Sequence, residues 1–170
     1  MELKELNAAE FEKLLKIYQS TAAWLAEKGQ AMWNPIYIAD RESFVTKYLD
    51  PRCYGLYMDG DLAGGFIIKK REDFFWSEDP ERSYWYIHKL VVDRLYSGMG
   101  LADAMLDWIL RASIEAHIDS VRLECYSDRK YLTDLYLRCG FELHEIQEMD
   151  DGVKIALFHR DNSEVSEGFE

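Results

Sequence analysis

The segment "KLVVDRLYSGMGLADAMLDWIL", residues 89–110, decides the fold of this chain. An apolar, β-branched run ends at Val92 and an amphipathic run begins near Met99, so the pattern predicts a strand, a short loop and a helix. Gly98 and Gly100 lie in that loop, where glycine permits left-handed backbone angles and the close approach of a ligand. Because the first turn of a helix carries unpaired N–H groups and partial positive charge, the segment indicates either an anion-binding loop or a plain tight turn.

The spacing of the glycines argues against two familiar nucleotide loops. A dinucleotide-binding loop has the pattern GxGxxG, and its third glycine position holds Asp103 here. The strand also follows a predicted hairpin and does not open a βαβ unit. A phosphate-binding loop of the Walker type needs GK[ST], which this segment lacks. An anion bound here would therefore be held by another kind of loop.

The rest of the chain shows clear helix and strand signals. Asn7 and Glu10 form a capping-box pattern before the first helix, Gly29 ends that helix, and Pro51 ends the second one. In chain order, the predicted elements are a strand at 2–6, helices from 8 and from 41, a hairpin at 52–70, a strand at 84–92, a helix from 99, a strand at 119–126, a helix at 130–139 and a hairpin at 141–159. The order β-α-α-β-β-β-α-β-α-β-β predicts an α/β (α+β) fold, with a mixed, mostly antiparallel, twisted sheet of about seven strands flanked by four helices.

Length and charge narrow the class of protein. A chain of 170 residues, 48% of them hydrophobic, can bury a core, and we expect one domain over 1–160 and an acidic, flexible tail over 161–170. The net charge of −12 argues against nucleic acid and anionic membranes and suits a cationic ligand.

Other features of the composition point to the interior of a cell. No apolar run approaches the roughly 18 residues of a membrane helix, and the three cysteines show neither metal-site nor disulfide spacing. We therefore expect no membrane partner, no metal and a reducing cytoplasm.

The glycine loop resembles motif A of the GNAT (GCN5-related) N-acetyltransferases. That family's signature, [Q/R]-x-x-G-x-[G/A], follows its fourth strand, and residues 97–102 read SGMGLA in the same place. The glycine and the final small residue match, whereas Ser97 stands where Arg or Gln is usual.

A second motif strengthens the resemblance. The family's YxxxGF signature follows its fifth strand, and Tyr136, Gly140 and Phe141 match it. Arg129 stands seven residues before the tyrosine, where the family often has Asn. Since the predicted element order is also similar to that of the GNAT fold, the resemblance covers nearly all of residues 1–160.

The resemblance implies acetyl-CoA as the donor and an amine as the acceptor. Amides of the glycine loop would hold the pyrophosphate, and the end of the preceding strand would pair with the pantetheine arm. A homodimer is also expected, because many relatives are dimers. Carried over to this sequence, the donor-binding residues are Leu90, Val91, Val92, Ser97, Gly98, Met99, Gly100, Leu101, Ala102 and Arg129.

Acetyl transfer to an amine needs a proton acceptor, an oxyanion donor and a proton for the leaving thiolate. Tyr136 suits the last role, because a phenol of pKa about 10 would face a thiolate of about 8.5; the alternative is an ordinary core tyrosine. His88 and Glu124 are candidate bases, with a water chain as the alternative. A backbone N–H near Leu90 or Val91 is the candidate oxyanion donor, and alternation along the strand would put His88 on the same face as Leu90.

Three functions remain open on the sequence. The first is an acetyl-CoA-dependent N-acetyltransferase acting on a primary amine of a small molecule or peptide, by direct attack through a tetrahedral intermediate. The second is a non-catalytic acetyl-CoA-binding module that serves as a sensor or partner protein. The third is an unrelated Cys/His enzyme that uses Cys53 or Cys125, for which the sequence holds no signature.

Overall fold

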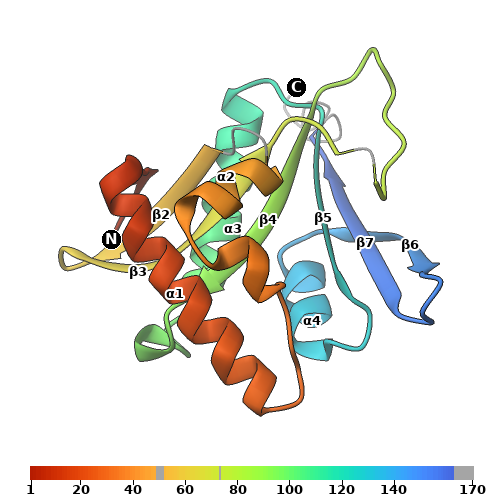
Figure 1. The fold of residues 1–170 in the computed structure, drawn as a ribbon. Coiled ribbons are helices and arrows are strands. Elements are labelled where there is room, and N and C mark those ends of the chain that lie inside the picture. Colours follow the sequence, from red (N-terminus) through yellow and green to blue (C-terminus); the bar gives the residue numbers. More distant parts are fainter. Residues whose placement is uncertain (49–51, 73, 163–170) are drawn as a thin grey trace. The chain divides into compact units, whose positions relative to one another are not determined.

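The structure is a computed structural model that describes residues 1–48, 52–72 and 74–162 (Figure 1). Pro51 and residues 163–170 of the predicted tail lie outside these ranges. The helices and strands follow the predicted order. They are β1 (Glu2–Glu5), α1 (Ala8–Glu27), η1 (Pro35–Ile38), α2 (Arg41–Tyr48), β2 (Arg52–Met58), β3 (Asp61–Lys69), β4 (Tyr84–Val92), η2 (Arg94–Tyr96), α3 (Leu101–Glu115), β5 (Ser120–Tyr126), α4 (Lys130–Arg138), β6 (Glu142–Glu148) and β7 (Lys154–Asp161), η being short 3-10 helices.

The seven strands of the described residues form one sheet, in the order β1-β2-β3-β4-β5-β7-β6. β4 and β5 pair in parallel, whereas the pairs β1–β2, β2–β3, β5–β7 and β6–β7 are antiparallel. A parallel pair needs a long crossover connection, and α3 supplies it between β4 and β5. The predicted mixed, mostly antiparallel sheet with four α-helices is confirmed.

The chain divides into two compact units. The first comprises Met1–Ile68 and Lys89–Met105, and the second comprises Lys69–His88 and the chain from Leu106 onward. The division falls at the last residue of β3, within β4 and within α3. It does not decide whether residues 1–160 behave as one domain, and that expectation stays a prediction.

Helix α1 of the first unit is fixed by its caps. The Asn7 side chain accepts from the N–H of Glu10, and the Glu10 carboxylate accepts from the N–H of Asn7, both at 2.9 Å. This is the predicted capping box, and left-handed Gly29 follows the helix end, with φ +70°. Although α1 has 20 residues, neither it nor another helix in the described ranges is long and apolar enough to cross a bilayer.

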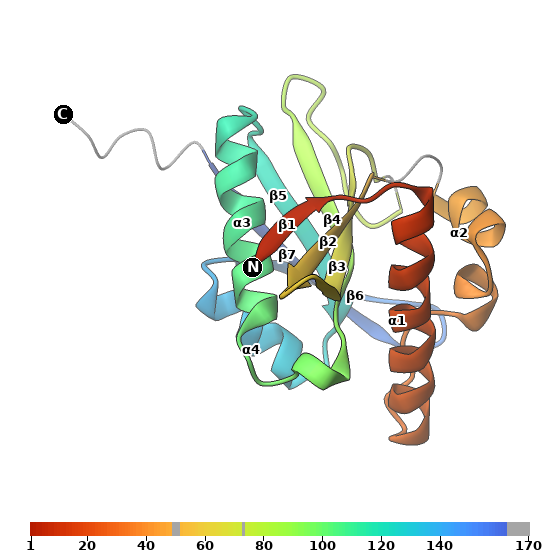
Figure 2. The same cartoon turned by 90° about the vertical axis from the view of Figure 1, so that its left-hand side faces the viewer.

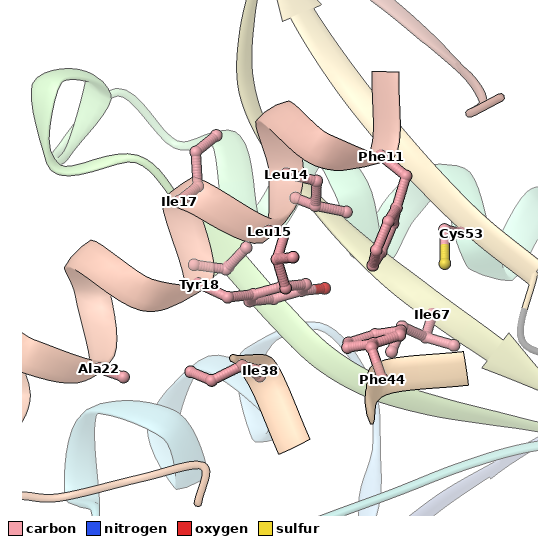
Figure 3. Packing of buried hydrophobic residues seen from close by; sticks show 11 residues of the cluster. Phe11, Leu14, Leu15, Ile17, Tyr18, Ala22, Ile38, Phe44, Cys53 and Ile67 are labelled. Carbon is pink, nitrogen blue, oxygen red and sulfur yellow. The ribbon is translucent and has the colours of Figure 1, made fainter. Parts of the chain in front are cut away.

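The core of the first unit lies where α1 and α2 pack on the strands. Figure 2 shows α1 beside β2 and β3, and Figure 3 shows the side chains between them. Tyr18 of α1 stacks on Phe44 of α2 with ring centroids 6.0 Å apart, and both are fully buried. Each such side chain contributes roughly 1.5–3 kcal/mol, so the cluster fixes the helices against the sheet. Its buried members are Phe11, Leu14, Leu15, Ile17, Tyr18, Ala22, Ile38, Phe44, Cys53, Ile67 and Val91.

The end of β4 approaches β3 closely at Gly64. A Cβ added to Gly64 would lie 2.4 Å from the carbonyl oxygen of Val91 and 3.2 Å from the Cα of Val92. Backbone atoms cannot rotate out of such a contact, so this position requires glycine. The N–H of Asp93 donates to the carbonyl of Ala63 at 2.8 Å. Together these contacts fix the position of the end of β4, after which the glycine loop follows.

β5 is a buried strand of the second unit. Val121, Leu123 and Cys125 are buried at alternate positions, as the sequence predicts. Arg122 is also buried, with its guanidinium carbon 3.8 Å from the ring centroid of Tyr84. Over its whole length β5 pairs with β7, so Glu124 is presented on a rigid strand.

Candidate active site

The glycine loop of the first unit is left-handed and open. Gly98 and Gly100 have φ of +76° and +74°, an angle that costs other residues about 1–2 kcal/mol. A Cβ on either glycine would meet none of the described atoms within 4 Å. Glycine is therefore required here by the backbone angle and not by crowding, and the space around the loop is free for a ligand.

Helix α3 begins at Leu101, two residues after its predicted start near Met99. The left-handed Gly100 cannot belong to a right-handed helix, which explains the later start. Its carbonyl accepts the first helical hydrogen bond, from the N–H of Ala104 at 3.1 Å. The amides of Leu101 and Ala102 lie in the first turn, where the helix offers them no acceptor. The loop and helix thus supply the backbone donors that an anion needs.

The end of β4 contains a left-handed residue that no sequence pattern indicates. Lys89 has φ +51°, and the hydroxyl of Tyr18 donates to its carbonyl at 2.8 Å. A left-handed residue interrupts the alternation of side chains along a strand. The expectation that His88 and Leu90 share one face assumed regular alternation, and that assumption is wrong because the strand does not alternate regularly at Lys89. Whether residues 90–92 and 97–102 contact a donor stays a prediction.

In the second unit, the parallel ladder between β4 and β5 is short. It pairs residues 84–86 with residues 120–122. Within the described part of this unit, it does not continue to Ile87 and His88. Where strands stop pairing, their backbone N–H and C=O groups need other partners.

His88 lies between two carboxylates. Its Nδ1 is 3.5 Å from Oε1 of Glu124, and its Nε2 is 3.5 Å from Oε2 of Glu72. The three side chains are only 14%, 15% and 14% exposed for His88, Glu72 and Glu124. The structure therefore brings the two predicted bases together and adds Glu72. The sequence signal for Glu72 is weak, because it is one of several acids in the segment before β4.

The surroundings of Glu124 favour its protonated form. Burial raises the pKa of Glu124 to about 7, and the charge of Glu72 adds to the increase, while the Trp76 hydrogen bond and Lys69 oppose it. The indole N–H of Trp76 donates to Oε2 of Glu124 at 3.2 Å. A carboxyl group with this pKa exchanges protons at neutral pH, as a general acid or base must.

The same three side chains could hold a metal ion. One ligand atom from each of Glu72, His88 and Glu124 lies within 4.8 Å of the others. Imidazole and carboxylate are ordinary ligands of divalent metals. The expectation that the protein uses no metal therefore stays a prediction.

Tyr136 is a buried residue of α4. Its ring centroid lies 6.2 Å from that of Phe141 and 5.5 Å from that of Phe158. Burial raises the pKa of Tyr136 well above its ordinary value, and the charges of Cys125 and Glu124 raise it further. The phenol keeps its proton at neutral pH and can donate a hydrogen bond, but full transfer of that proton is more uphill than from an exposed tyrosine.

Arg129 lies directly before α4. Its Nη1 is 2.7 Å from Oδ1 of Asp128, and its guanidinium carbon is 5.1 Å from the ring centroid of Tyr126. These contacts hold the side chain near the start of the helix. A role of Arg129 in donor binding stays a prediction.

The cysteines offer no support for a Cys/His enzyme. Cys53 and Cys125 are both buried, and burial raises the pKa of each thiol to about 12. A nucleophilic cysteine needs a lowered pKa, because the thiolate is the reactive form.

A mixed sheet with a crossover helix that opens at a glycine loop defines a fold of the GNAT class. The profile of the acetyltransferase (GNAT) family matches residues 11–141. The chain therefore belongs to this family of transferases, and the predicted family and enzyme class are confirmed.

Individual relatives agree with the family profile. An uncharacterized N-acetyltransferase of Bacillus subtilis (strain 168), YesJ, is 24% identical over 136 residues, which cover 77% of this chain and 76% of YesJ. The crystal structure of a GNAT acetyltransferase from Listeria monocytogenes 4b F2365 matches 94% of both chains, with a TM-score of 0.73 and 22% identity. A Bacillus subtilis acetyltransferase solved in complex with CoA matches 94% of this chain and 96% of its own, with a TM-score of 0.63 and 16% identity. At these identities, the solved structures establish the fold.

Proposed function

We propose that this chain transfers an acetyl group from acetyl-CoA to a primary amine of a small molecule or peptide. The observation that carries the proposal is the left-handed glycine loop at the start of α3, in a chain of the GNAT family. The donor pyrophosphate would lie on the amides of residues 98–102, and the pantetheine arm would pair with residues 90–92. The short ladder between β4 and β5 is consistent with this, because the arm needs strand backbone that is not already paired.

The chemistry would proceed by direct attack. An amine of pKa about 10.4 is charged at pH 7 and must first lose a proton; His88 and Glu124 are the proposed acceptors, because they are close together and Glu124 titrates near neutral pH. Attack on the thioester carbonyl forms a tetrahedral intermediate, and a backbone N–H near Leu90 would stabilise its oxyanion. The C–S bond then breaks, and Tyr136 would protonate the thiolate of CoA.

The charge of the chain supports a cationic acceptor. With 32 acidic and 20 basic residues, the chain attracts amines that carry positive charge. This favours small amines and basic peptides over acidic ones as acceptors.

Two measurements test the proposal in sequence. Acetyl-CoA at 100 times its Kd should stabilise the chain by about 2.7 kcal/mol in thermal unfolding, and no shift at millimolar acetyl-CoA would contradict donor binding. Release of CoA thiol is then followed across a panel of primary amines. Donor binding without release on any amine would favour the non-catalytic binding module instead.

Tyr136→Phe tests the proposed proton donor. Removing the hydroxyl should lower kcat by about 10²-fold, the lower end of the usual range for general acid catalysis, while acetyl-CoA binding changes little. Steady-state kinetics and the thermal shift measure the two effects separately. Tyr131→Phe is a matched control, because Tyr131 lies on the same helix and is 49% exposed. Equal rates for Tyr136→Phe and the wild type would remove Tyr136 from the mechanism.

A further inference from the structure

His88 and Glu124 lie at matching positions of two parallel strands in the second unit. The ladder between β4 and β5 pairs residues 84–86 with residues 120–122, and the same register, continued by two residues, places His88 opposite Glu124. Side chains at opposed strand positions point to the same face of a sheet. In agreement, Nδ1 of His88 lies 3.5 Å from Oε1 of Glu124. Two side chains of metal-binding type are therefore presented by adjacent strands, which hold a site more precisely than loops do.

Glu72 adds a third such side chain from the segment after β3. Its Oε2 lies 3.5 Å from Nε2 of His88, and one ligand atom from each of Glu72, His88 and Glu124 lies within 4.8 Å of the others. Two ligands that are each about 2.1 Å from a tetrahedral ion lie about 3.5 Å apart. Whichever imidazole nitrogen binds the ion, one carboxylate oxygen is thus already at this separation, so small side-chain movements suffice to complete the site.

Hydrogen bonds orient both carboxylates toward the imidazole. The indole N–H of Trp76 donates to Oε2 of Glu124 at 3.2 Å, and Oε1 faces His88. In the same way, the N–H of Phe74 donates to Oε1 of Glu72 at 3.0 Å, and Oε2 faces His88. Each carboxylate therefore has one oxygen held by a donor and the other presented to the imidazole. Outer hydrogen bonds of this kind are typical of metal ligands, and they distinguish this group from a cluster of surface acids.

Burial and ligand type favour a transition metal at this place. The side chains of Glu72 and Glu124 are only 15% and 14% exposed, so water screens the repulsion between their charges poorly, and a cation between them removes it. One imidazole and two carboxylates suit ions such as Zn²⁺, whereas Mg²⁺ and Ca²⁺ prefer oxygen ligands. Three protein ligands also leave a fourth position of a tetrahedral ion for water.

We propose that Glu72, His88 and Glu124 bind one divalent transition-metal ion, and that the bound ion inhibits acetyl transfer. The inhibition, though not the binding, rests on the proposed function, in which His88 and Glu124 accept the proton of the amine. Lone pairs that bind an ion cannot accept a proton, and a bound dication repels a protonated amine. The ion is therefore a reversible inhibitor and not a part of the catalytic machinery.

Calorimetric titration of the chelator-treated full chain with Zn²⁺ tests the site. We expect one ion per chain. Glu72→Gln keeps the size of the side chain and removes a charged ligand, so it should weaken binding at least about ten-fold. Glu81→Gln is the matched control, because it removes the same charge from an exposed position of the same segment, and its affinity for Zn²⁺ should equal that of the wild type.

Two histidine variants locate the ion independently of Glu72. His88→Gln should also weaken binding at least about ten-fold. His144→Gln should leave it unchanged, although the rings of His144 and His159 lie 5.3 Å apart and offer a second place for zinc. Thermal unfolding of the metal-free variants checks that each one is folded. Absence of binding at millimolar Zn²⁺, unchanged affinity in Glu72→Gln and His88→Gln, or loss of binding in His144→Gln would each overturn the site.

Inhibition is measured on the acetylated amine by mass spectrometry, because the released CoA thiol itself binds zinc. Zn²⁺ should inhibit the wild type at concentrations near its Kd, and Glu72→Gln should require at least about ten-fold more. If Zn²⁺ binds at the site and the rate of transfer does not change, the inhibitory role is refuted and the proposed function stands. If Zn²⁺ binds as expected but acetyl-CoA modifies no amine of the panel, the proposed function fails and the ion site stands.

Discussion

Glu124 and Lys89 reach pKa values near 7 from opposite directions. Burial raises the pKa of the carboxyl and lowers that of the amine, because in both cases the charged form loses its water. Each lies in a different compact unit and on a different strand. Both residues are thus partly protonated at neutral pH, whereas an exposed glutamate is almost fully deprotonated and an exposed lysine almost fully protonated.

At the same scale, Gly100→Ala tests the glycine loop. The φ of +74° should cost the variant about 1–2 kcal/mol of stability, and the strained loop should bind acetyl-CoA about ten-fold more weakly. Calorimetric titration of acetyl-CoA measures the affinity, and thermal unfolding measures the stability.

Gly152→Ala is the matched control for that variant. Gly152 has a similar φ of +85° and also has no described atom within 4 Å of its Cβ position, but it lies in the turn between β6 and β7. It should lose similar stability and keep its affinity for acetyl-CoA. An equal loss of affinity in both variants would show that the loop has no special part in donor binding.

At the scale of elements, the path of β4 depends on a close backbone contact. Gly64 of β3 leaves room for the carbonyl of Val91, and Tyr18 of α1 fixes the carbonyl of Lys89. The proposed pantetheine-binding segment is therefore positioned by a neighbouring strand and by a helix distant in sequence. Neither contact can be read from the residues of β4 themselves.

Gly64→Ala tests this dependence. Its Cβ would lie 2.4 Å from a carbonyl oxygen of the backbone, so β3 and β4 must separate, and we expect a loss of roughly 1–3 kcal/mol. Urea denaturation measures the free energy of unfolding. Gly55→Ala serves as the control, because its Cβ would meet the ends of the Leu62 and Leu6 side chains, which can rotate away. If the Gly64 variant is as stable as the Gly55 variant, the path of β4 does not depend on the close contact at Gly64.

At the scale of the whole molecule, the carboxyl of Glu124 couples stability to pH. Its pKa rises from 4.5 to about 7 on folding, so between these values the folded chain keeps a proton that the unfolded chain has released. Its contribution to stability is complete below pH 4.5 and falls as the pH rises through this window, by about 3 kcal/mol in total. Lys89 has the opposite effect above pH 7, because its pKa falls from 10.5 to about 7 on folding. Between these values the unfolded chain keeps a proton that the folded chain has released, so stability rises with pH.

Glu124→Gln should remove this slope. The glutamine does not titrate, so its free energy of unfolding should change by about 2 kcal/mol less than that of the wild type between about pH 5 and pH 7. Urea denaturation at several pH values in this range measures both proteins. Parallel curves for the two proteins would show that Glu124 is not the group responsible.

The local sequence determined the elements and the loop. Hydrophobic periodicity, the Asn7–Glu10 capping box and the glycines at 98 and 100 predicted the element order and the glycine loop before α3, because these signals act within a few residues along the chain. Two short motifs then sufficed to predict the family, which the profile match confirms. His88 and Glu124 were predicted as separate candidate bases, and the structure places them 3.5 Å apart.

Only the tertiary structure decided the surroundings of the reactive groups. The left-handed Lys89, the rings of Trp33 and Tyr48 around its amine, and the place of Glu72 beside His88 depend on contacts between residues distant in sequence. The pKa values near 7 follow from burial, which is a property of the folded chain and not of any single segment. Residue types and spacing therefore determined which groups are present, and packing determined which of them can exchange protons at neutral pH.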